Sequence, residues 1–318
     1  MAQRDAPAVR SAIHDPLQVE PTGLPRLWQA TMRMLLFAIL LASVGACHRT
    51  MPSGARQPLF FLQLADPQFG FFTANADFAR ETINFERAIA AANRLHPAFV
   101  IVCGDLTHRA GDAAQIAEYR RIVAGLDRSI PLYSVPGNHD LASPPTTASV
   151  QAFRAQYGPD RYTFTHGGLL GIVINSTLIK EPTGSPEETA AQEQWIRTTL
   201  DAARRRPHAW TLLFQHHSWF LAQADEPDQY FNLPLARRRE FLDLFKAAGV
   251  SHVFAGHYHR NAMGRDGTLE MVTTGPVGKP LGADSSGLRI VVLSDAGVEH
   301  RYYPLDSLPD RIQLPVAR

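Results

Sequence analysis

The chain has 318 residues and a formal net charge of +1, and 45% of its residues are hydrophobic. This length and apolar content suffice for one large α/β domain with a sizeable core plus a short leader. The near-neutral charge gives no reason to expect a nucleic-acid partner, and the sequence contains neither an internal repeat nor a low-complexity tract.

The first part of the chain differs in composition from the rest. Residues 1–27 are rich in Pro and charged side chains, and a 13-residue apolar run at 34–46 follows Arg33. A bilayer-spanning helix needs about 20 apolar residues, whereas the apolar part of a secretion signal needs about 7 to 15 after a positive residue. The run therefore predicts a secretion signal.

Residues 44–47, with the sequence VGAC, resemble a bacterial lipoprotein cleavage box, in which the cysteine carries the lipid and becomes the mature N-terminus. We expect residues 1–47 to be a leader that is cleaved before Cys47, and residues 48–58 to be a tether. The protein would then be exported to the bacterial periplasm or the cell surface and contact the membrane only through this lipid. Cys103 is the one other cysteine, so this scheme allows no intramolecular disulfide.

Residues 59–306 alternate apolar runs with longer amphipathic stretches, and residues 307–318 form a tail. We expect strands at 60–64, 99–103, 132–135, 162–165, 169–175, 210–214 and 252–255. We expect helices at 78–95, 113–126, 147–157, 187–205 and 235–248. The last strands, at 270–274, 288–293 and 298–303, are predicted to be antiparallel because Gly and Asp turns separate them. This order predicts a layered α/β domain.

Five of the predicted strands end on side chains that can bind a metal ion. In chain order these are Asp66 and Gln68, Asp105, Asn138, His216, and His257 and His259. Asp-Pro and Gly-Asn are common turn pairs, so each strand end alone is weak support for a site. Ligands bind beyond the carboxyl ends of strands in such sheets, so the five groups should meet at one edge. Gly104, Gly137 and Gly256 suit the close backbone approach that such a site requires. Together they predict a metal-dependent hydrolase.

These motifs resemble those of the calcineurin-like metallophosphoesterases, which have Asp-x-His, Gly-Asp, Gly-Asn-His-Asp/Glu, a single His and Gly-His-x-His in the same order. In this chain Gln68 takes the place of the first histidine. The branch typified by calcineurin-like phosphoesterase domain-containing protein 1, described as a Ser/Thr protein phosphatase, has Gln at this position. Further segments resemble that branch, at 65–70, 103–106, 230–233, 256–262 and 287–292.

The resemblance implies a four-layer α/β/β/α sandwich of two mixed sheets, with a centre of two divalent metal ions that can be Mn, Fe or Zn. It implies a first metal held by Asp66, Gln68, Asp105 and His259, and a second held by Asp105, Asn138, His216 and His257. The ions would activate a hydroxide that attacks the phosphoester. His139 would protonate the leaving oxygen, and Asp140 would hold the His139 imidazole in its protonated form.

Other polar residues near these motifs have weaker claims to a role. His108 is expected at the rim of the cleft, and Arg260 is a candidate for binding a phosphate oxygen because a guanidinium matches phosphate geometry. His217 should point to the opposite side of its strand from His216, so it is expected either next to the metal ligands without binding an ion, or on the surface.

Two groups of residues are expected to be structural. The first group is aromatic and is expected to pack in the core or in a loop rather than to form a substrate platform: Trp219, Phe220, Tyr230 and Phe231. The arginine triplets at 204–206 and 237–239 are expected to form solvated helix faces.

The motifs define the reacting centre more closely than the substrate. A phosphomonoester, on a small molecule or a phosphoprotein, follows from the resemblance, and a phosphodiester fits the same motifs equally well. A protein of another class, a lipid-anchored surface protein that binds a ligand without turnover, is the alternative that Gln68 raises. The sequence specifies no oligomeric state.

Overall fold

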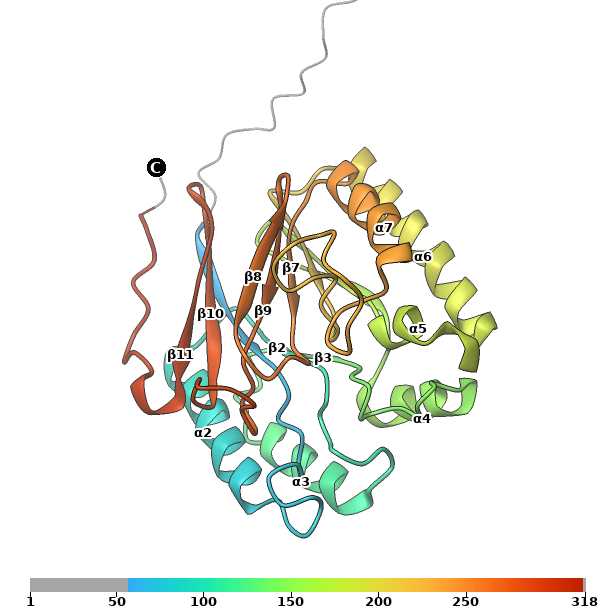
Figure 1. Ribbon diagram of the computed structural model, residues 1–318. Helices are drawn as coiled ribbons and strands as arrows, with labels where there is room; N and C mark the ends of the chain where they lie inside the picture. The colour runs from blue at the N-terminus through green and yellow to red at the C-terminus, as the bar shows by residue number, and fades with distance from the viewer. Residues whose placement is uncertain (1–56, 317–318) are drawn as a thin grey trace, which may run out of the picture. The chain divides into compact units, whose positions relative to one another are not determined.

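The structure is a computed structural model that describes residues 57–316, and it contains two mixed β-sheets (Figure 1). The first sheet has the order β11-β10-β1-β2-β3, formed by β11 (Gly297–Pro304), β10 (Gly287–Ser294), β1 (Leu59–Leu64), β2 (Val100–Cys103) and β3 (Leu132–Val135). The second has the order β4-β5-β6-β7-β9-β8, formed by β4 (Tyr162–His166), β5 (Leu169–Val173), β6 (Trp210–Phe214), β7 (Val250–Ala255), β9 (Leu269–Thr273) and β8 (Ala262–Asp266).

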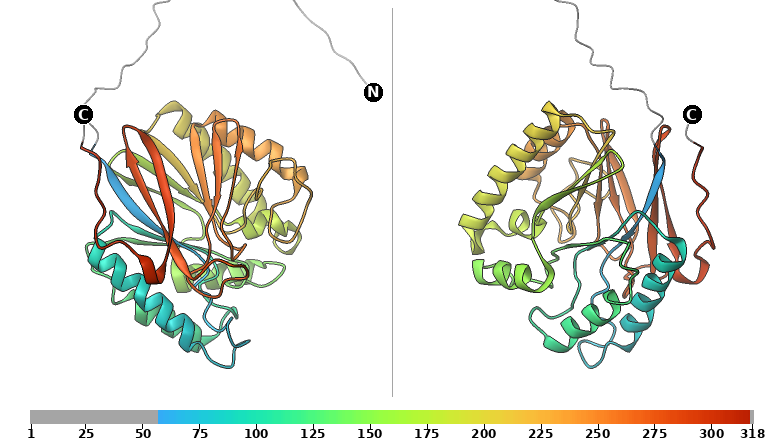
Figure 2. Two further views of the ribbon diagram at one scale, coloured as in Figure 1. Left: turned by 60° about the vertical axis from the view of Figure 1, so that its left-hand side comes forward. Right: turned by 180° about the vertical axis from the view of Figure 1, so that it is seen from behind.

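Helices cover the outer face of each sheet, as both views in Figure 2 show. The helices are α2 (Ala79–Leu95), α3 (Ala113–Val123), α4 (Thr147–Tyr157), α5 (Ser176–Lys180), α6 (Pro186–Arg205) and α7 (Leu235–Ala247). Side chains of α2, α3 and α4 pack on the first sheet, and those of α6 and α7 pack on the second. This arrangement confirms the predicted four-layer sandwich.

The core between the two sheets is aromatic. Phe61 of β1 and Phe99 stack with their ring centroids 4.6 Å apart, and Phe214 and Phe254 meet Phe61 edge-on. The alternating residues Phe60 and Leu62 face the helix layer instead. Both faces of β1 are therefore buried, which explains its continuous apolar sequence.

Helix α3 also positions a loop of the site. Its N-cap, Asp112, accepts hydrogen bonds from the backbone N–H groups of Ala114 and Gln115, which satisfies donors that the helix itself leaves unpaired. The Gln115 side chain then accepts from the backbone N–H groups of His108 and Arg109, each at 3.0 Å. These bonds fix the loop that follows Asp105.

Most predicted elements are present, with boundaries shifted by a few residues at most. Four were missed: β8, the five-residue helix α5, and the short 3-10 helices at Pro182–Gly184 and Leu305–Ser307. The prediction that all three C-terminal strands are antiparallel partners was wrong for residues 270–274. Strand β9 pairs parallel with β7 and antiparallel with β8, because a hairpin turn with Gly267 at φ +62° returns the chain from β8 to that sheet.

The structure describes most of the predicted C-terminal tail but almost none of the segment before the domain. Leu308 and Ile312 pack against the core of the first sheet, and Arg94 donates a hydrogen bond to the carbonyl of Pro309 at 2.7 Å. The predicted leader, the lipidation at Cys47 and nearly all of the tether lie outside the described residues. Within residues 57–316, no helix has the length and apolar character needed to cross a membrane.

Candidate metal centre

The ends of four strands from both sheets bring buried carboxylates and imidazoles together. Asp66 follows β1 and Asp105 follows β2, while His216 follows β6 and His257 follows β7. The Nε2 atom of His216 lies 3.4 Å from Oδ1 of Asp105, and its Nδ1 lies 3.8 Å from Oδ1 of Asp66. The backbone N–H of His257 donates to both carboxylate oxygens of Asp66. Residues nearly two hundred positions apart thus share one site.

The remaining predicted ligands lie in the same cluster. Oδ1 of Asn138 is 2.9 Å from Nε2 of His216, and Nε2 of His259 is 3.5 Å from Oδ1 of Asp66. The Gln68 amide donates to Oδ2 of Asp105 at 3.2 Å. All seven residues predicted to bind metal are therefore brought together.

Backbone conformation aims several of these side chains inward. Non-glycine residues with positive φ at the site are Asp66 (48°), Gln68 (44°), Asp105 (49°), His257 (67°) and His259 (53°). Side-chain-bearing residues rarely adopt this conformation, and it costs about 1 kcal/mol or more for each. Five instances in one cluster indicate a functional site, where such strain concentrates.

The ring nitrogens of the three histidines are oriented for metal binding. Each ring hydrogen-bonds a backbone carbonyl through one nitrogen: Nδ1 of His216 with Cys103, Nδ1 of His259 with Lys279, and Nε2 of His257 with Tyr230. Such contacts fix the tautomer and leave the other nitrogen with a free lone pair. Metal-binding histidines in proteins show this same arrangement.

The atoms that face one another in the cluster are mostly hydrogen-bond acceptors. The free Nε2 of His216 faces oxygens of Asn138 and Asp105, and Oε1 of Gln68 is buried with no hydrogen-bond partner among the described residues. Within residues 57–316, Oε1 of Gln68 thus lacks a donor, and a buried acceptor in this state is costly unless a cation lies beside it. This chemistry fits a site for divalent metal ions, with Asp105 central to it.

Charges in the cluster are strongly coupled. Burial alone would raise the pKa of Asp105, but the neighbouring His216 and His139 outweigh it and hold that pKa well below its usual range. Burial would lower the pKa of His216, yet Asp105 raises it to about 9, so that a metal ion has to displace the Nε2 proton before this nitrogen offers its lone pair. Burial lowers the pKa of His259 to about 4, so that this imidazole is neutral at pH 7, the form that binds a metal.

His139 borders the cluster, but its predicted contact with Asp140 was wrong. Nδ1 of His139 lies 2.9 Å from the carbonyl of His108, to which it donates, and the backbone N–H of His139 donates to Oδ1 of Asp105 at 2.8 Å. The Asp140 carboxylate instead accepts from the backbone N–H groups of Gly137, Leu106 and Thr107. Asp140 therefore fixes the two loops that carry Asp105 and His139.

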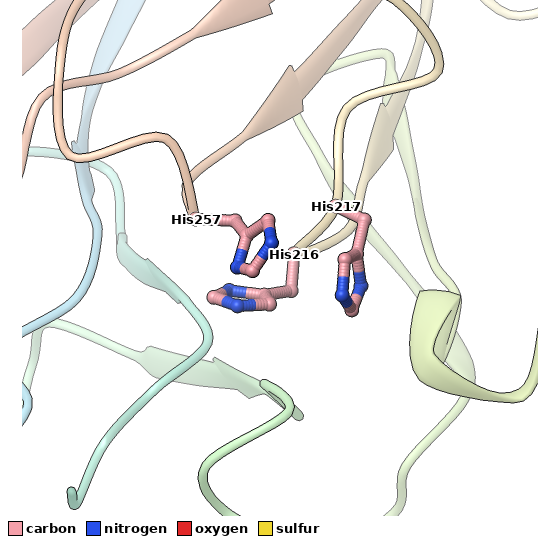
Figure 3. A group of neighbouring side chains, drawn as sticks. All are labelled: His216, His217 and His257. Atoms are coloured by element: carbon pink, nitrogen blue, oxygen red, sulfur yellow. The ribbon is translucent and has the colours of Figure 1, made fainter. Parts of the chain in front are cut away.

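Of the two positions expected for His217, the structure shows the one next to the predicted ligands, although the expected direction, opposite to His216, was wrong. His217 is buried rather than on the surface, and its ring lies beside that of His257 with the centroids 4.3 Å apart. Figure 3 shows the imidazoles of His216, His217 and His257 gathered at the ends of β6 and β7. The chain leaves strand geometry after Phe214, so side chains no longer alternate between opposite faces.

The two candidates for substrate contact have different surroundings. The half-buried ring of His108 stacks on His139 at 4.7 Å and on Phe71 at 4.9 Å, at the border of the cluster. Arg260 instead donates from Nε and Nη2 to the carbonyl of Leu281 and lies over the ring of Tyr258. These contacts hold the Arg260 guanidinium in a structural role.

The four aromatic side chains lie in two different places, and one arginine that was expected to be solvated is buried. Trp219 and Phe220 belong to the core, as predicted, whereas Tyr230 and Phe231 lie beside His257 with ring centroids at 4.9 and 5.6 Å. Arg238 was predicted to be solvated but is 1% exposed. It donates to three backbone carbonyls of the loop that follows β6, including that of Leu233 at 2.7 Å.

This fold and this site define a metallophosphoesterase, a hydrolase acting on phosphoester bonds. The profile of the calcineurin-like phosphoesterase family matches residues 61–261, and the chain belongs to this family, whose members use divalent metals. Serine/threonine-protein phosphatase CPPED1 of Danio rerio is 39% identical over 269 residues, covering 80% of this chain and 87% of that protein. The protein of the same name from Homo sapiens is 38% identical over 270 residues, covering 80% and 86%.

Solved structures of distant sequence share the fold. GAP50, the anchor in the inner membrane complex of Plasmodium, matches with a TM-score of 0.58 at 12% identity, over 78% of this chain and 85% of that one. A dimetal phosphatase from Danio rerio matches with a TM-score of 0.52 at 14% identity, over 77% of this chain and 99% of that one. These similarities support the sandwich architecture alone.

Proposed function

We propose that this phosphoesterase uses two divalent metal ions, Mn, Fe or Zn, and hydrolyses phosphomonoesters of serine or threonine. The observation that carries the proposal is the set of buried acceptors around Asp105. Asp105 contacts Gln68 and His216, while His259 contacts Asp66 and Asn138 contacts His216. In the proposed centre Asp66, Gln68 and His259 would hold one ion with Asp105, and Asn138, His216 and His257 the other. Two ions need a shared carboxylate between them, and Asp105 lies where both ligand sets meet.

The bound ions would supply Lewis acidity, which activates water and stabilises charge on the phosphate oxygens. The chain itself supplies the proton for the leaving group. The Nδ1–H of His139 is anchored on the carbonyl of His108, so a second proton on the ring is carried at Nε2. Nε2 donates that proton to the departing alcohol oxygen. Stacking on His108 keeps the ring in this orientation.

The relatives favour a phosphoprotein substrate. Those at 37% to 39% identity over about 80% of this chain are named serine/threonine-protein phosphatases. Tyr230 is 60% exposed beside the predicted ligand His257, which leaves aromatic surface at the site for an organic group next to the phosphate.

The test measures bound metal and compares substrates on the metal-loaded protein. We expect turnover of a phosphothreonine peptide and an aryl phosphate, with slower cleavage of the aryl diester. Asp105→Asn keeps the size of the side chain and should lower both bound metal and turnover by at least about 100-fold, because the shared charge is lost. Asp306→Asn, at an exposed carboxylate, is the matched control. Tight metal binding without turnover would support the ligand-binding alternative, and a preference for the diester would refute the monoesterase.

We further propose that the protein is exported and anchored by a lipid on Cys47. The support is the apolar run at 34–46 followed by the VGAC sequence. Mass spectrometry of the mature protein from a bacterial membrane fraction should find a lipidated Cys47 at the N-terminus. Cys47→Ser should release the protein from that fraction, and an unmodified N-terminus upstream of residue 34 would refute the proposal.

A further inference from the structure

A cavity of about 80 Å³ opens beside the predicted ligand Asn138. His217, Tyr230, Thr177 and Lys180 line it together with Asn138. A water molecule takes up about 30 Å³ in the liquid, so the space holds a group of a few non-hydrogen atoms. The cavity therefore adjoins the reacting centre and is large enough for the part of a substrate next to its phosphate.

The walls of this cavity are fixed by hydrogen bonds from α5. Nζ of Lys180 donates to the carbonyls of Gln229 at 2.8 Å and Asn232 at 2.6 Å, on both sides of Tyr230. The ammonium is thereby used to hold the loop that carries Tyr230. This geometry makes Lys180 a positioning residue for the cavity wall.

Ser176, the first residue of α5, determines which nitrogen of His217 carries a proton. Its Oγ accepts from the backbone N–H groups of His216 at 3.2 Å and His217 at 2.8 Å. A serine hydroxyl has two acceptor sites and one proton, so its remaining capacity is to donate. The third contact, with Nδ1 of His217 at 3.1 Å, is then a bond that Ser176 donates. Nδ1 is an acceptor, and the proton of the neutral ring lies on Nε2.

This tautomer gives His217 a different role from that of the metal ligands beside it. His216, His217 and His257 have ring nitrogens within 4.8 Å of one another, which is close enough for a shared ion (Figure 3). However, His216 and His257 contact backbone carbonyls that can only accept, whereas His217 contacts a hydroxyl that donates. The first two rings present lone pairs to the site. His217 presents an N–H donor.

We propose that this cavity binds the organic part of the phosphoester, and that His217 donates a hydrogen bond from Nε2 to a carbonyl or hydroxyl oxygen of that part. The inference rests on the proposed phosphomonoesterase function and narrows its substrate class. Phosphothreonine within a peptide has a backbone carbonyl a few bonds from its ester oxygen. An aryl phosphate has no such oxygen, so it cannot use this donor.

The test uses a matched pair of substitutions in the metal-loaded protein. In His217→Gln the amide nitrogen can reach the position of Nε2, whereas in His217→Asn it reaches only that of Nδ1. We expect His217→Asn to lower kcat/KM about threefold to tenfold more on a phosphothreonine peptide than on an aryl phosphate, the effect of one neutral hydrogen bond. His217→Gln should restore most of that difference. Calorimetry with a peptide carrying a non-hydrolysable phosphonate should show the same loss of affinity and recovery.

Three outcomes would overturn the inference. Loss of bound metal in His217→Asn would make His217 a ligand. Equal losses on peptide and aryl phosphate, or unchanged affinity for the phosphonate peptide, would show that no donor reaches the organic part. Failure of the wild-type protein to cleave either phosphomonoester would instead refute the proposed function, and the phosphonate measurement would still decide the role of His217.

Discussion

Gly137→Ala tests the packing of the site, because it adds one methyl group between two strand ends. A Cβ at Gly137 would lie 2.1 Å from the backbone nitrogen of Asp105 and 2.2 Å from its Oδ1, whereas ordinary contact begins near 3.4 Å. The loop after β3 and the loop after β2 must therefore separate by roughly 1 Å, a displacement that costs about 100-fold in rate at a reacting centre. Overpacking of this kind costs about 1 to 3 kcal/mol of unfolding free energy.

The assays are kcat on an aryl phosphate, bound metal after dialysis, and urea denaturation. Gly125→Ala is the control, since it lies in an exposed turn after α3 and its added Cβ would meet only the carbonyl of Ile122, at 3.2 Å. We expect the control to change the free energy of unfolding by about 0.5 kcal/mol or less. Wild-type turnover and metal content in Gly137→Ala would show that the two loops do not approach as closely as described.

Three further predictions concern other parts of the chain. Arg238→Met leaves backbone carbonyls without a donor and should lower the unfolding free energy by about 3 kcal/mol in urea, while the exposed Arg239→Met should change it little. Gln68→His replaces an amide with an imidazole and should raise affinity for a transition metal about tenfold in chelator competition; unchanged affinity would exclude Gln68 as a ligand. Burial lowers the pKa of His252 to about 4, so the unfolded chain binds more protons than the folded chain below pH 6.5. The free energy of unfolding therefore decreases as the pH is lowered. His252 should account for about 2 kcal/mol of the loss between pH 7 and 5, and His252→Phe should remove that share.

The sequence predicts the layers well because both faces of most strands are buried. Continuous apolar runs such as 99–103 have few alternatives to a buried strand, and amphipathic stretches between them have one apolar face. β8 was missed because its sequence, Ala262–Asp266, contains Gly, Arg and Asp and lies at the edge of its sheet. Helix α5 has only five residues, too few to show a helical period.

The metal ligands were predictable and their supporting contacts were not. The ligands follow apolar strands in motifs of recognisable order, whereas the partner of an imidazole depends on packing between distant segments. Asp140 is adjacent to His139 in sequence yet bonds the amides after Asp105. Ser176, 40 positions before His216, has no sequence signal that would link it to that strand end. Residue type determines the chemistry available, and tertiary structure determines which atoms use it.

The strained turns at the strand ends determine how the ligand residues of the sequence are placed in the tertiary structure. Asp66 and Gln68 are two positions apart and would share a face of an extended strand, but the strand would carry them away from Asp105 and His257 along its own direction. Positive φ at Asp66, Gln68 and Asp105 turns the backbone sharply at the strand ends, so that these side chains stay in the cluster. Gly, Asn, Asp and His tolerate this conformation better than Gln does, so Gln68 in particular is held there by surrounding contacts. The core between the two sheets offsets that cost, and the ligand cluster therefore depends on the packing of both sheets.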